Sequence, residues 1–237
     1  MHTIEQRLQT KNWDTILEAL NNNGFAIVPD LINDSECAEL LHEFNEEYRY
    51  RKTVVMERYR FGKGVYKYFN YPLPNMLTEL RENFYGYLAP LANKWMEVLK
   101  TKTRYPRKHH EFIARCKENG QEKATALILG YGAGGFCAMH QDLYGEVYFP
   151  LQIVLFLDDV DKDYTGGEFI LTENIPMAQS RTHAIKPKKG DVIIFATNFR
   201  PVKGVKGYYR VTMKHGVSTI HSGERHTLGI IFHDAKS

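Results

Sequence analysis

His140, Asp142 and His215 are the residues of this 237-residue chain whose types and positions best suit catalysis. His140 and Asp142 stand two apart in the stretch FCAMHQDLYGEVYFP (136–150), and side chains two apart point the same way on an extended chain. His215 falls on the apolar face of the alternating stretch YYRVTMKHGV. An inward histidine needs a partner, because burying an unpaired polar group costs free energy.

Two imidazoles and one carboxylate form the ligand set of a 2-His-1-carboxylate triad, which leaves coordination positions open on Fe(II). We therefore predict a metal centre at His140, Asp142 and His215. Zn(II) and Mn(II) accept the same ligand types, and an HxD pair can also be a core histidine beside a loop aspartate. The other candidate histidines are expected to be structural or exposed: His183, His221 and His233.

Arg225 begins the stretch RHTLGIIF, which is otherwise mostly apolar. A guanidinium that enters an apolar core requires a carboxylate to pair with. Thr227 shares its face of the strand, and Tyr131 can supply a phenol, so these three residues predict a pocket for an acidic co-substrate. The alternative is an internal salt bridge from Arg225 to Glu224 or Asp234.

The pattern of apolar residues changes at about residue 124. Before it, stretches such as WDTILEALNNNG and NMLTELRENFYGYLAPLANKWMEVLK have helical spacing, while residues 48–72 are expected to be irregular. After it, short apolar runs recur between turn signals, which is typical of an all-β sandwich or barrel. We predict an α+β chain with a mainly helical N-terminal region (1–123) packed, in the same domain, on a β-core (124–237). His140 and Asp142 would end the first strong strand of that core.

The order Tyr, HxD, a long gap, His, then Arg resembles the Fe(II)/2-oxoglutarate-dependent dioxygenases. TGGEFIL (165–171) resembles a Gly-Gly turn of the prolyl-hydroxylase-like branch, and HGVSTIHSGERHTLGIIF (215–232) resembles that branch's distal His and Arg segment. The resemblance implies a double-stranded β-helix (jelly-roll) core. It also implies coupling of 2-oxoglutarate decarboxylation, with O2, to hydroxylation of a C–H bond.

The same resemblance implies a role for each candidate residue. His140, Asp142 and His215 would be the Fe(II) ligands. Arg225 would pair with the distal carboxylate of 2-oxoglutarate, helped by Tyr131 and Thr227.

Stretches along most of the chain, including YRYRK, YKYFNYPLP, LAPLANKW and YGAGGFCAMHQDLYGEVYFPLQ, resemble a mainly bacterial group within these oxygenases. That group is described as acting oxidatively on damaged DNA, by likeness to the AlkB-type demethylases. Two features depart from the AlkB pattern: Leu129 replaces an Asn, and no second Arg follows Arg225. Both departures favour the hydroxylase branch.

Charge placement is the remaining guide to the substrate, because the net charge is only +3. Residues 48–72 hold seven Arg or Lys and eight Tyr or Phe against one acid, Glu57, and residues 174–223 hold nine Arg or Lys against Asp191. Basic stretches with interleaved aromatic residues suit a phosphate backbone and stacked bases. Alkylated nucleic acid is therefore one predicted substrate, and a protein side chain or a small molecule is the alternative.

Two other classes remain open at this point. One is a metal-binding jelly roll of the cupin type, which would not need an inward Arg225. The other is a nucleic-acid-binding module with a structural His and Asp cluster, which would never turn over 2-oxoglutarate. The three cysteines are odd in number and far apart, and no apolar run is long enough for a bilayer. We expect a cytoplasmic protein without a membrane partner.

Overall fold

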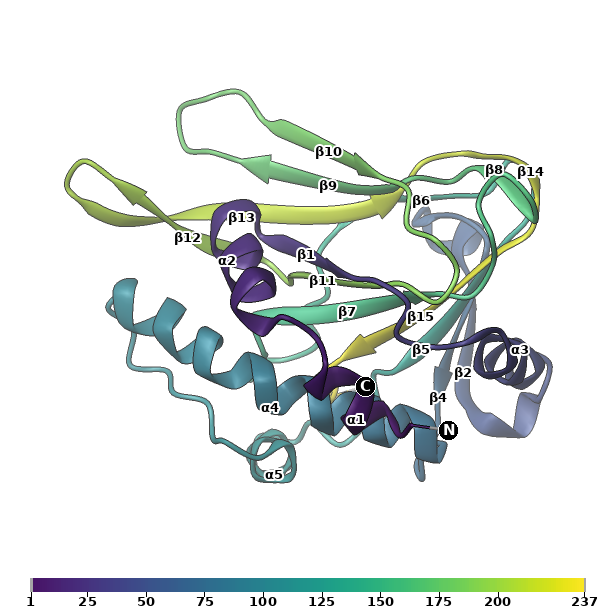
Figure 1. Ribbon diagram of the computed structural model, residues 1–237, viewed down its shortest axis with the longest axis horizontal. Coiled ribbons are helices and arrows are strands. Elements are labelled where there is room, and N and C mark those ends of the chain that lie inside the picture. Colours follow the sequence, from purple (N-terminus) through teal and green to yellow (C-terminus); the bar gives the residue numbers. More distant parts are fainter. Residues whose placement is uncertain (1, 237) are drawn as a thin grey trace.

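Two antiparallel sheets face each other in the computed structural model, which describes residues 2–236 (Figure 1). The larger sheet has seven strands in the order β1 (Phe25–Val28), β11 (Val192–Ala196), β7 (Leu151–Phe156), β15 (Arg225–Ile231), β5 (Leu127–Tyr131), β4 (Val65–Phe69) and β2 (Tyr50–Val55). The smaller sheet has the order β10 (Arg181–Ile185), β9 (Phe169–Asn174), β13 (Gly207–Val217), β6 (Phe136–His140) and β3 (Gly62–Lys63), and β12 (Phe199–Gly204) also pairs with β13. A short ladder joins β14 (Ile220–Gly223) to β8 (Tyr164–Gly166).

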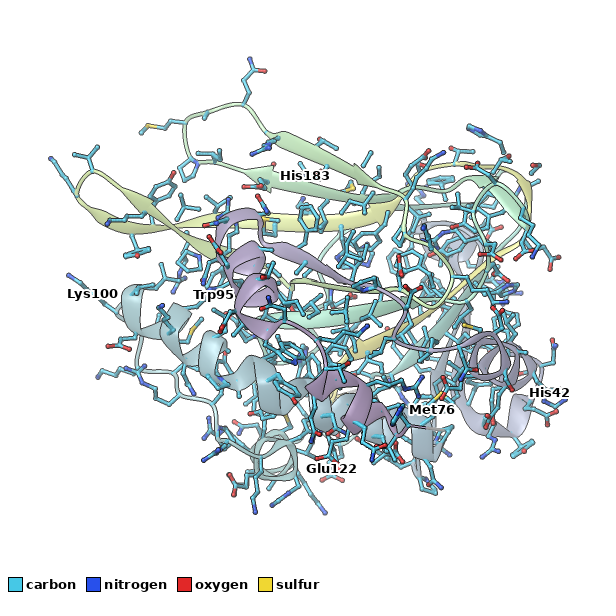
Figure 2. The ribbon with its side chains drawn as sticks, in the orientation of Figure 1. His42, Met76, Trp95, Lys100, Glu122 and His183 are labelled. Atoms are coloured by element: carbon cyan, nitrogen blue, oxygen red, sulfur yellow. The ribbon has the colours of Figure 1, made fainter. Side chains whose placement is uncertain are left out.

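The long helix α4 (Asn75–Val98), together with α1 (Ile4–Gln9) and α5 (His109–Glu118), lies on the side of the larger sheet away from the smaller sheet (Figure 1). The other helical elements are α2 (Trp13–Asn23), α3 (Asp34–Glu43) and the 3-10 turns η1 (Glu47–Arg49) and η2 (Met56–Tyr59). Trp95 of α4 is buried, and its Nε1 donates to Asn21 Oδ1 at 2.8 Å, which ties α4 to α2 (Figure 2). Helix α2 ends at its C-cap, Gly24, the last residue of the stretch WDTILEALNNNG, whose φ of +76° is a left-handed conformation that favours glycine.

Apart from Gln152, strand β7 has apolar side chains on both faces, because each face is covered. Leu151, Ile153 and Leu155 belong to the core cluster shared with the helices, whereas Val154 and Phe156 belong to the cluster between the two sheets. A strand buried on both faces has no simple alternation of apolar and polar residues. Together with the helices, these sheets confirm the predicted α+β class.

Residues 48–72 differ from the sequence prediction, which was wrong in describing them as irregular. They form β2, η2, β3 and β4, and β4 pairs with β5 in the larger sheet. Lys67 is one residue that hid the strand pattern of β4: its side chain is buried, and its Nζ donates to the Phe44 carbonyl at 2.9 Å and pairs with Glu47. The first 123 residues therefore contain helices and also strands of both sheets.

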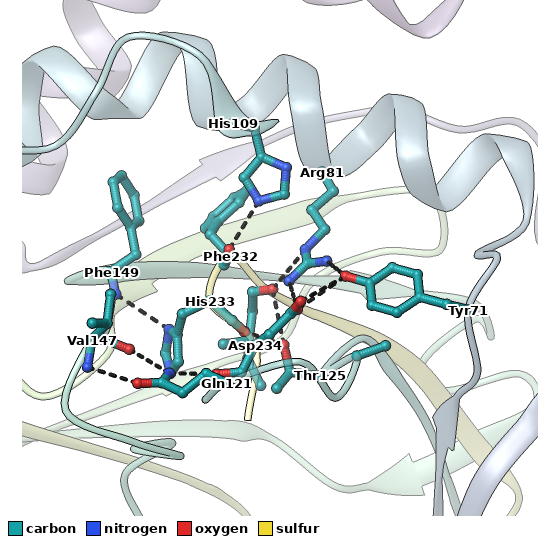
Figure 3. A network of polar contacts seen from close by, with 12 residues as sticks. Tyr71, Arg81, His109, Gln121, Thr125, Val147, Phe149, Phe232, His233 and Asp234 are labelled. Carbon is teal, nitrogen blue, oxygen red and sulfur yellow. Dashed lines mark hydrogen bonds and ion pairs between the residues drawn. The ribbon is translucent and has the colours of Figure 1, made fainter. Parts of the chain in front are cut away.

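The segment after β15 is anchored to α4 by a buried polar network (Figure 3). The Arg81 guanidinium donates to Asp234 Oδ1 at 2.7 Å, to the Tyr71 hydroxyl at 2.6 Å and to the Ile231 carbonyl at 3.1 Å. Both side chains of the Arg81–Asp234 pair are nearly inaccessible, at 3% and 2% exposure. The network fixes the C-terminal end of β15, whose N-terminal end carries Arg225.

Within residues 2–236, none of the helices combines the length and the apolar character that crossing a bilayer requires.

We expect Asp234→Asn or Arg81→Met to lower the free energy of unfolding by about 3–5 kcal/mol, because each change leaves one buried partner uncompensated. Urea denaturation measures this. Lys236→Met is the control, since Lys236 and Glu146 form an exposed pair at 3.5 Å that contributes little. The double variant Arg81→Met/Asp234→Leu should recover part of the loss. Single variants as stable as the wild type would contradict this role for the pair.

Candidate active site

The pairing of β13 with β6 brings the two predicted histidine ligands together. His215 and His140 are directly opposite each other in the register of this antiparallel pair, and their ring centroids lie 4.2 Å apart. The predicted inward face of β13 is observed, since Val211, Met213 and His215 are all buried. His140 ends β6, a separate strand from β5, so the expectation that it ends the first strong strand was wrong. The Gly-rich segment 132–135 separates the two strands.

Asp142 completes the cluster just beyond the end of β6. Its Oδ2 lies 3.2 Å from His215 Nε2, and its Oδ1 lies 3.6 Å from His140 Nε2. One ligand atom from each of the three residues lies within 4.8 Å of the others. Two imidazole nitrogens and a carboxylate oxygen at this spacing can hold one metal ion on one side and leave its other side open.

Hydrogen bonding and charge prepare these three groups for a cation. His140 Nδ1 donates to the Ala138 carbonyl at 2.8 Å, and its Nε2 lies 3.6 Å from Asp142 Oδ1. Burial opposes protonation of His140, but the Asp142 charge raises its pKa to about 11, so a metal would displace a proton from Nε2. Burial opposes ionisation of Asp142, but the His140 charge and the hydrogen bonds from both imidazoles hold the pKa of its carboxyl well below the ordinary range. Burial and the neighbouring His140 charge lower the pKa of His215. Asp142 is therefore an anion and His215 is neutral, as metal ligands must be, whereas His140 would lose its proton when a metal binds.

The other candidate histidines lie elsewhere, as predicted. His221 is exposed. The Nε2 of His183, on β10, lies 2.8 Å from the buried Glu173 carboxylate (Figure 2). His233 is fully buried, and its Nδ1 accepts a hydrogen bond from the Phe149 backbone at 3.2 Å. None of the three contributes to the cluster around Asp142.

An inner cavity of about 60 Å³ extends from the three candidate ligands between the two sheets. Arg225, Tyr131 and Thr227 all line it, so the structure brings the predicted co-substrate residues to one cavity. Arg225 and Tyr131 are opposite each other in the pairing of β15 with β5, which explains their proximity. The guanidinium carbon lies 5.6 Å from the Tyr131 ring centroid, 5.3 Å from that of Phe156 and 5.9 Å from that of Tyr164.

Arg225 differs from the other buried arginines in residues 2–236. Arg81 pairs with Asp234 and Arg200 pairs with Glu173, each at 2.7 Å. Arg225 is 1% exposed, yet none of its three guanidinium nitrogens has a hydrogen-bond partner within the described residues. Neither alternative partner pairs with it, because Asp234 is bound by Arg81 and Glu224 is exposed. A buried guanidinium in this state calls for an anionic ligand.

Besides Arg225 and the Nδ1 of His215, two groups that line the inner cavity lack hydrogen-bond partners within the described residues. The Tyr131 hydroxyl is buried, and burial raises the pKa of this phenol well above 10, so it remains a donor. Gln152 is 2% exposed, and its amide nitrogen is also without a partner. The sequence prediction missed Gln152. The only signal for it was one amide inside the apolar run LQIVLF.

A second, outer pocket of about 390 Å³ adjoins the candidate ligands His140 and Asp142 on the side of η2 and β6. Its wall includes Tyr66, Tyr68, Leu127, Leu129 and Tyr144, together with Arg60 and Phe61. Apolar and aromatic walls with a few phenol groups suit a flat, partly polar ring. The candidate metal site therefore has an inner cavity that suits an anion and an outer pocket that suits an aromatic group.

Residues 64–235 match the family model Oxygenase-NA, described as "Oxygenase, catalysing oxidative methylation of damaged DNA". The matched residues include the three candidate metal ligands and the residues of the inner cavity. A protein from two strains of Mycobacterium tuberculosis is 44% identical to this chain over 164 residues, which are 69% of this chain and 70% of that protein.

Solved structures share the fold at low sequence identity. A Pseudomonas putida prolyl-4-hydroxylase superposes with a TM-score of 0.56 at 13% identity, over 92% of this chain and 96% of that one. A 2-oxoglutarate-Fe(II) oxygenase family oxidoreductase from Burkholderia pseudomallei gives a TM-score of 0.53 at 16% identity, over 95% and 94% of the two chains. The predicted jelly-roll fold of these oxygenases is confirmed.

We expect His215→Ala and Asp142→Ala each to weaken Mn(II) binding by more than roughly 100-fold, because losing a direct ligand costs more than losing a residue that only supports one. Calorimetric titration of the purified chain measures this. His221→Ala is the control and should bind Mn(II) like the wild type, since His221 lies outside the cluster. If His215→Ala retains wild-type affinity, the three residues are not the metal site.

Proposed function

This chain belongs to the Oxygenase-NA family of oxygenases, and we propose that it hydroxylates a C–H bond of an alkylated base in nucleic acid, using Fe(II), 2-oxoglutarate and O2. The oxygenase class predicted from the sequence is confirmed by this membership. The observation that carries the choice of co-substrate is the buried, unpartnered guanidinium of Arg225 beside the candidate metal ligands.

His140, Asp142 and His215 would hold Fe(II) on one side. When bound, Fe(II) and 2-oxoglutarate supply the oxidising chemistry, in which O2 is consumed, 2-oxoglutarate becomes succinate and CO2, and a substrate C–H becomes C–OH. The donor set suits the metal, because imidazole and carboxylate ligands with open positions favour Fe(II). Asp142 contributes the negative charge, and His215 contributes a buried, neutral nitrogen.

Arg225 would bind the distal carboxylate of 2-oxoglutarate in the inner cavity. A planar guanidinium can donate two parallel hydrogen bonds to a carboxylate, which fixes both position and orientation. Tyr131 would donate a third hydrogen bond, and Thr227 offers a hydroxyl on the same strand face as Arg225. The rings of Phe156 and Tyr164 lie beside the guanidinium, so water competes poorly for the ion pair.

The outer pocket would receive the base. The phenol and aliphatic walls at Tyr66, Tyr68 and Leu127 suit stacking and edge contacts with a base that has been turned out of its stack. Hydroxylation of an N-methyl group would give a hemiaminal, which releases formaldehyde and leaves the base unmethylated. This interpretation agrees with the demethylation predicted from the sequence.

The η2–β3 turn would contact the strand beside that base. Tyr59 and Phe61 are 55% and 48% exposed, and their rings stack with centroids 5.5 Å apart. Arg58 and Arg60 are exposed on the same turn. Exposed stacked rings with adjacent cations suit a single strand, in which bases stack on aromatic side chains and cations follow the phosphates.

We expect 2-oxoglutarate turnover, followed as succinate release with Fe(II), to depend on the charge of Arg225. Arg225→Met should lower kcat/KM for 2-oxoglutarate at least about 30-fold, equivalent to about 2 kcal/mol, because a buried carboxylate loses its partner. The matched comparison is 2-oxopentanoate, which lacks the distal carboxylate. The wild type should strongly prefer 2-oxoglutarate, and Arg225→Met should lose that preference. An unchanged preference in the variant would exclude Arg225 as the carboxylate-binding residue.

We expect a methylated single-stranded oligonucleotide to raise succinate release and to lose the mass of one methylene unit in the same reaction. Arg58→Gln/Arg60→Gln should weaken binding and reduce the slope of log Kd against log salt by up to about 1.4, at about 0.7 for each phosphate that is no longer neutralised. Lys100→Gln/Lys102→Gln is the control, because Lys100 follows α4 on another part of the surface (Figure 2). If only uncoupled, His215-dependent succinate release appears with every oligonucleotide, the substrate is a protein side chain or a small molecule instead.

A further inference from the structure

Two hydrogen-bonded tyrosines, Tyr68 and Tyr144, connect the wall of the outer pocket to the Asp142 carboxylate. The Tyr144 hydroxyl donates to Asp142 Oδ1 at 2.7 Å, and the Tyr68 hydroxyl donates to the Tyr144 oxygen at 2.9 Å. The direction of these bonds follows from charge, because an ionised carboxylate can only accept.

Packing contacts hold both tyrosine side chains in place. Tyr68 lies on β4 and is 7% exposed, and the Arg51 guanidinium carbon lies 4.7 Å from its ring centroid. Arg51 Nε donates to the Ala124 carbonyl at 2.8 Å, which fixes the guanidinium in turn. The Tyr144 ring packs in a cluster with Tyr68, and its centroid lies 6.1 Å from that of His233. The donor that reaches Asp142 is therefore packed against the core.

The two oxygens of Asp142 have different surroundings as a result. Oδ1 accepts the hydrogen bond from Tyr144 and lies 3.6 Å from His140 Nε2, whereas Oδ2 is the oxygen nearer to a candidate ligand, at 3.2 Å from His215 Nε2. A hydrogen bond to one oxygen fixes the rotation of the carboxylate and leaves the other oxygen directed at the metal site. Without it, the carboxylate could rotate or bind through both oxygens, and would then fill a position needed by the co-substrate.

We propose that Tyr144 and Tyr68 are positioning residues that hold Asp142 so that Oδ2 alone binds the metal. The proposal rests on the proposed function, in which Asp142 is a metal ligand, and it adds residues outside the predicted site. Because Tyr68 and Tyr144 also line the outer pocket, their hydrogen bonds would link the wall of that pocket to the metal ligand Asp142.

The test is Mn(II) affinity, measured by calorimetry on the full chain without substrate or turnover. Tyr144→Phe keeps the ring and removes only the donor, and the Mn(II) Kd should rise roughly 10- to 100-fold. Tyr68→Phe should raise it less, because Tyr68 acts through Tyr144. The double variant Tyr68→Phe/Tyr144→Phe should match Tyr144→Phe alone, which independent sites would not do.

The control is Tyr148→Phe. Tyr148 follows Tyr144 closely in the chain and its ring also faces His233, at a centroid distance of 6.4 Å, but the hydroxyl that reaches Asp142 belongs to Tyr144. The Tyr148→Phe variant should bind Mn(II) like the wild type. Thermal unfolding of every variant separates a change in affinity from a loss of folded protein.

Tyr144→Phe with wild-type Mn(II) affinity would overturn the proposal while leaving the oxygenase assignment intact. If the losses of Mn(II) affinity add up in the double variant, Tyr68 does not act through Tyr144. A wild-type protein that binds no Mn(II) would overturn both this proposal and the proposed function. The absorption spectrum of the Co(II)-loaded protein gives a second readout, since a change from one-oxygen to two-oxygen binding alters the metal geometry and a purely structural role for Tyr144 would not.

Discussion

The buried guanidinium of Arg225 is the constraint around which the interior of this protein is arranged. A charge that is 1% exposed and has no partner within residues 2–236 is stable only if an anion joins it or the field of its surroundings supports it. The rings of Tyr131, Phe156 and Tyr164 lie close to the guanidinium carbon and supply part of that support. In the proposed function, a carboxylate of the co-substrate would meet the remaining requirement, and the inner cavity would then select for an acidic ligand.

The candidate metal site divides the space between the sheets into two chemically different parts. The inner cavity has cationic and hydroxyl donors, whereas the outer pocket has aromatic and aliphatic walls. Asp142 belongs to both, because one oxygen faces His215 and the other accepts from Tyr144. An acidic co-substrate and an aromatic substrate can therefore approach the same candidate metal ligands from different sides. That separation is what a reaction between two bound molecules requires.

Rigid elements hold these parts in place. The Arg81–Asp234 network fixes the end of β15, and register with β5 then sets Arg225 opposite Tyr131. The core shared by α4 and the larger sheet supports the same strand from its outer face. By contrast, the η2–β3 turn exposes Tyr59 and Phe61 to solvent. The residues proposed to bind the metal and the co-substrate are packed in the core, whereas the turn proposed to contact nucleic acids of different sequence is on the surface.

Residue types and spacing in the sequence determined the chemistry: two histidines, one carboxylate, an arginine in an apolar strand and the order in which they occur. These signals are local. The alternation of apolar and polar residues in YYRVTMKHGV placed His215 on the inward face, and Arg225 stood out as a charged residue in the mostly apolar stretch RHTLGIIF. Only the tertiary structure decided which partners each group has, because that depends on contacts between distant segments. Asp234 could have paired with Arg225 but is bound by Arg81, Lys67 is buried although its type favours the surface, and Tyr68 of β4 reaches Asp142 through Tyr144, far along the chain. Such contacts are fixed by strand register and packing, which no short stretch of sequence specifies.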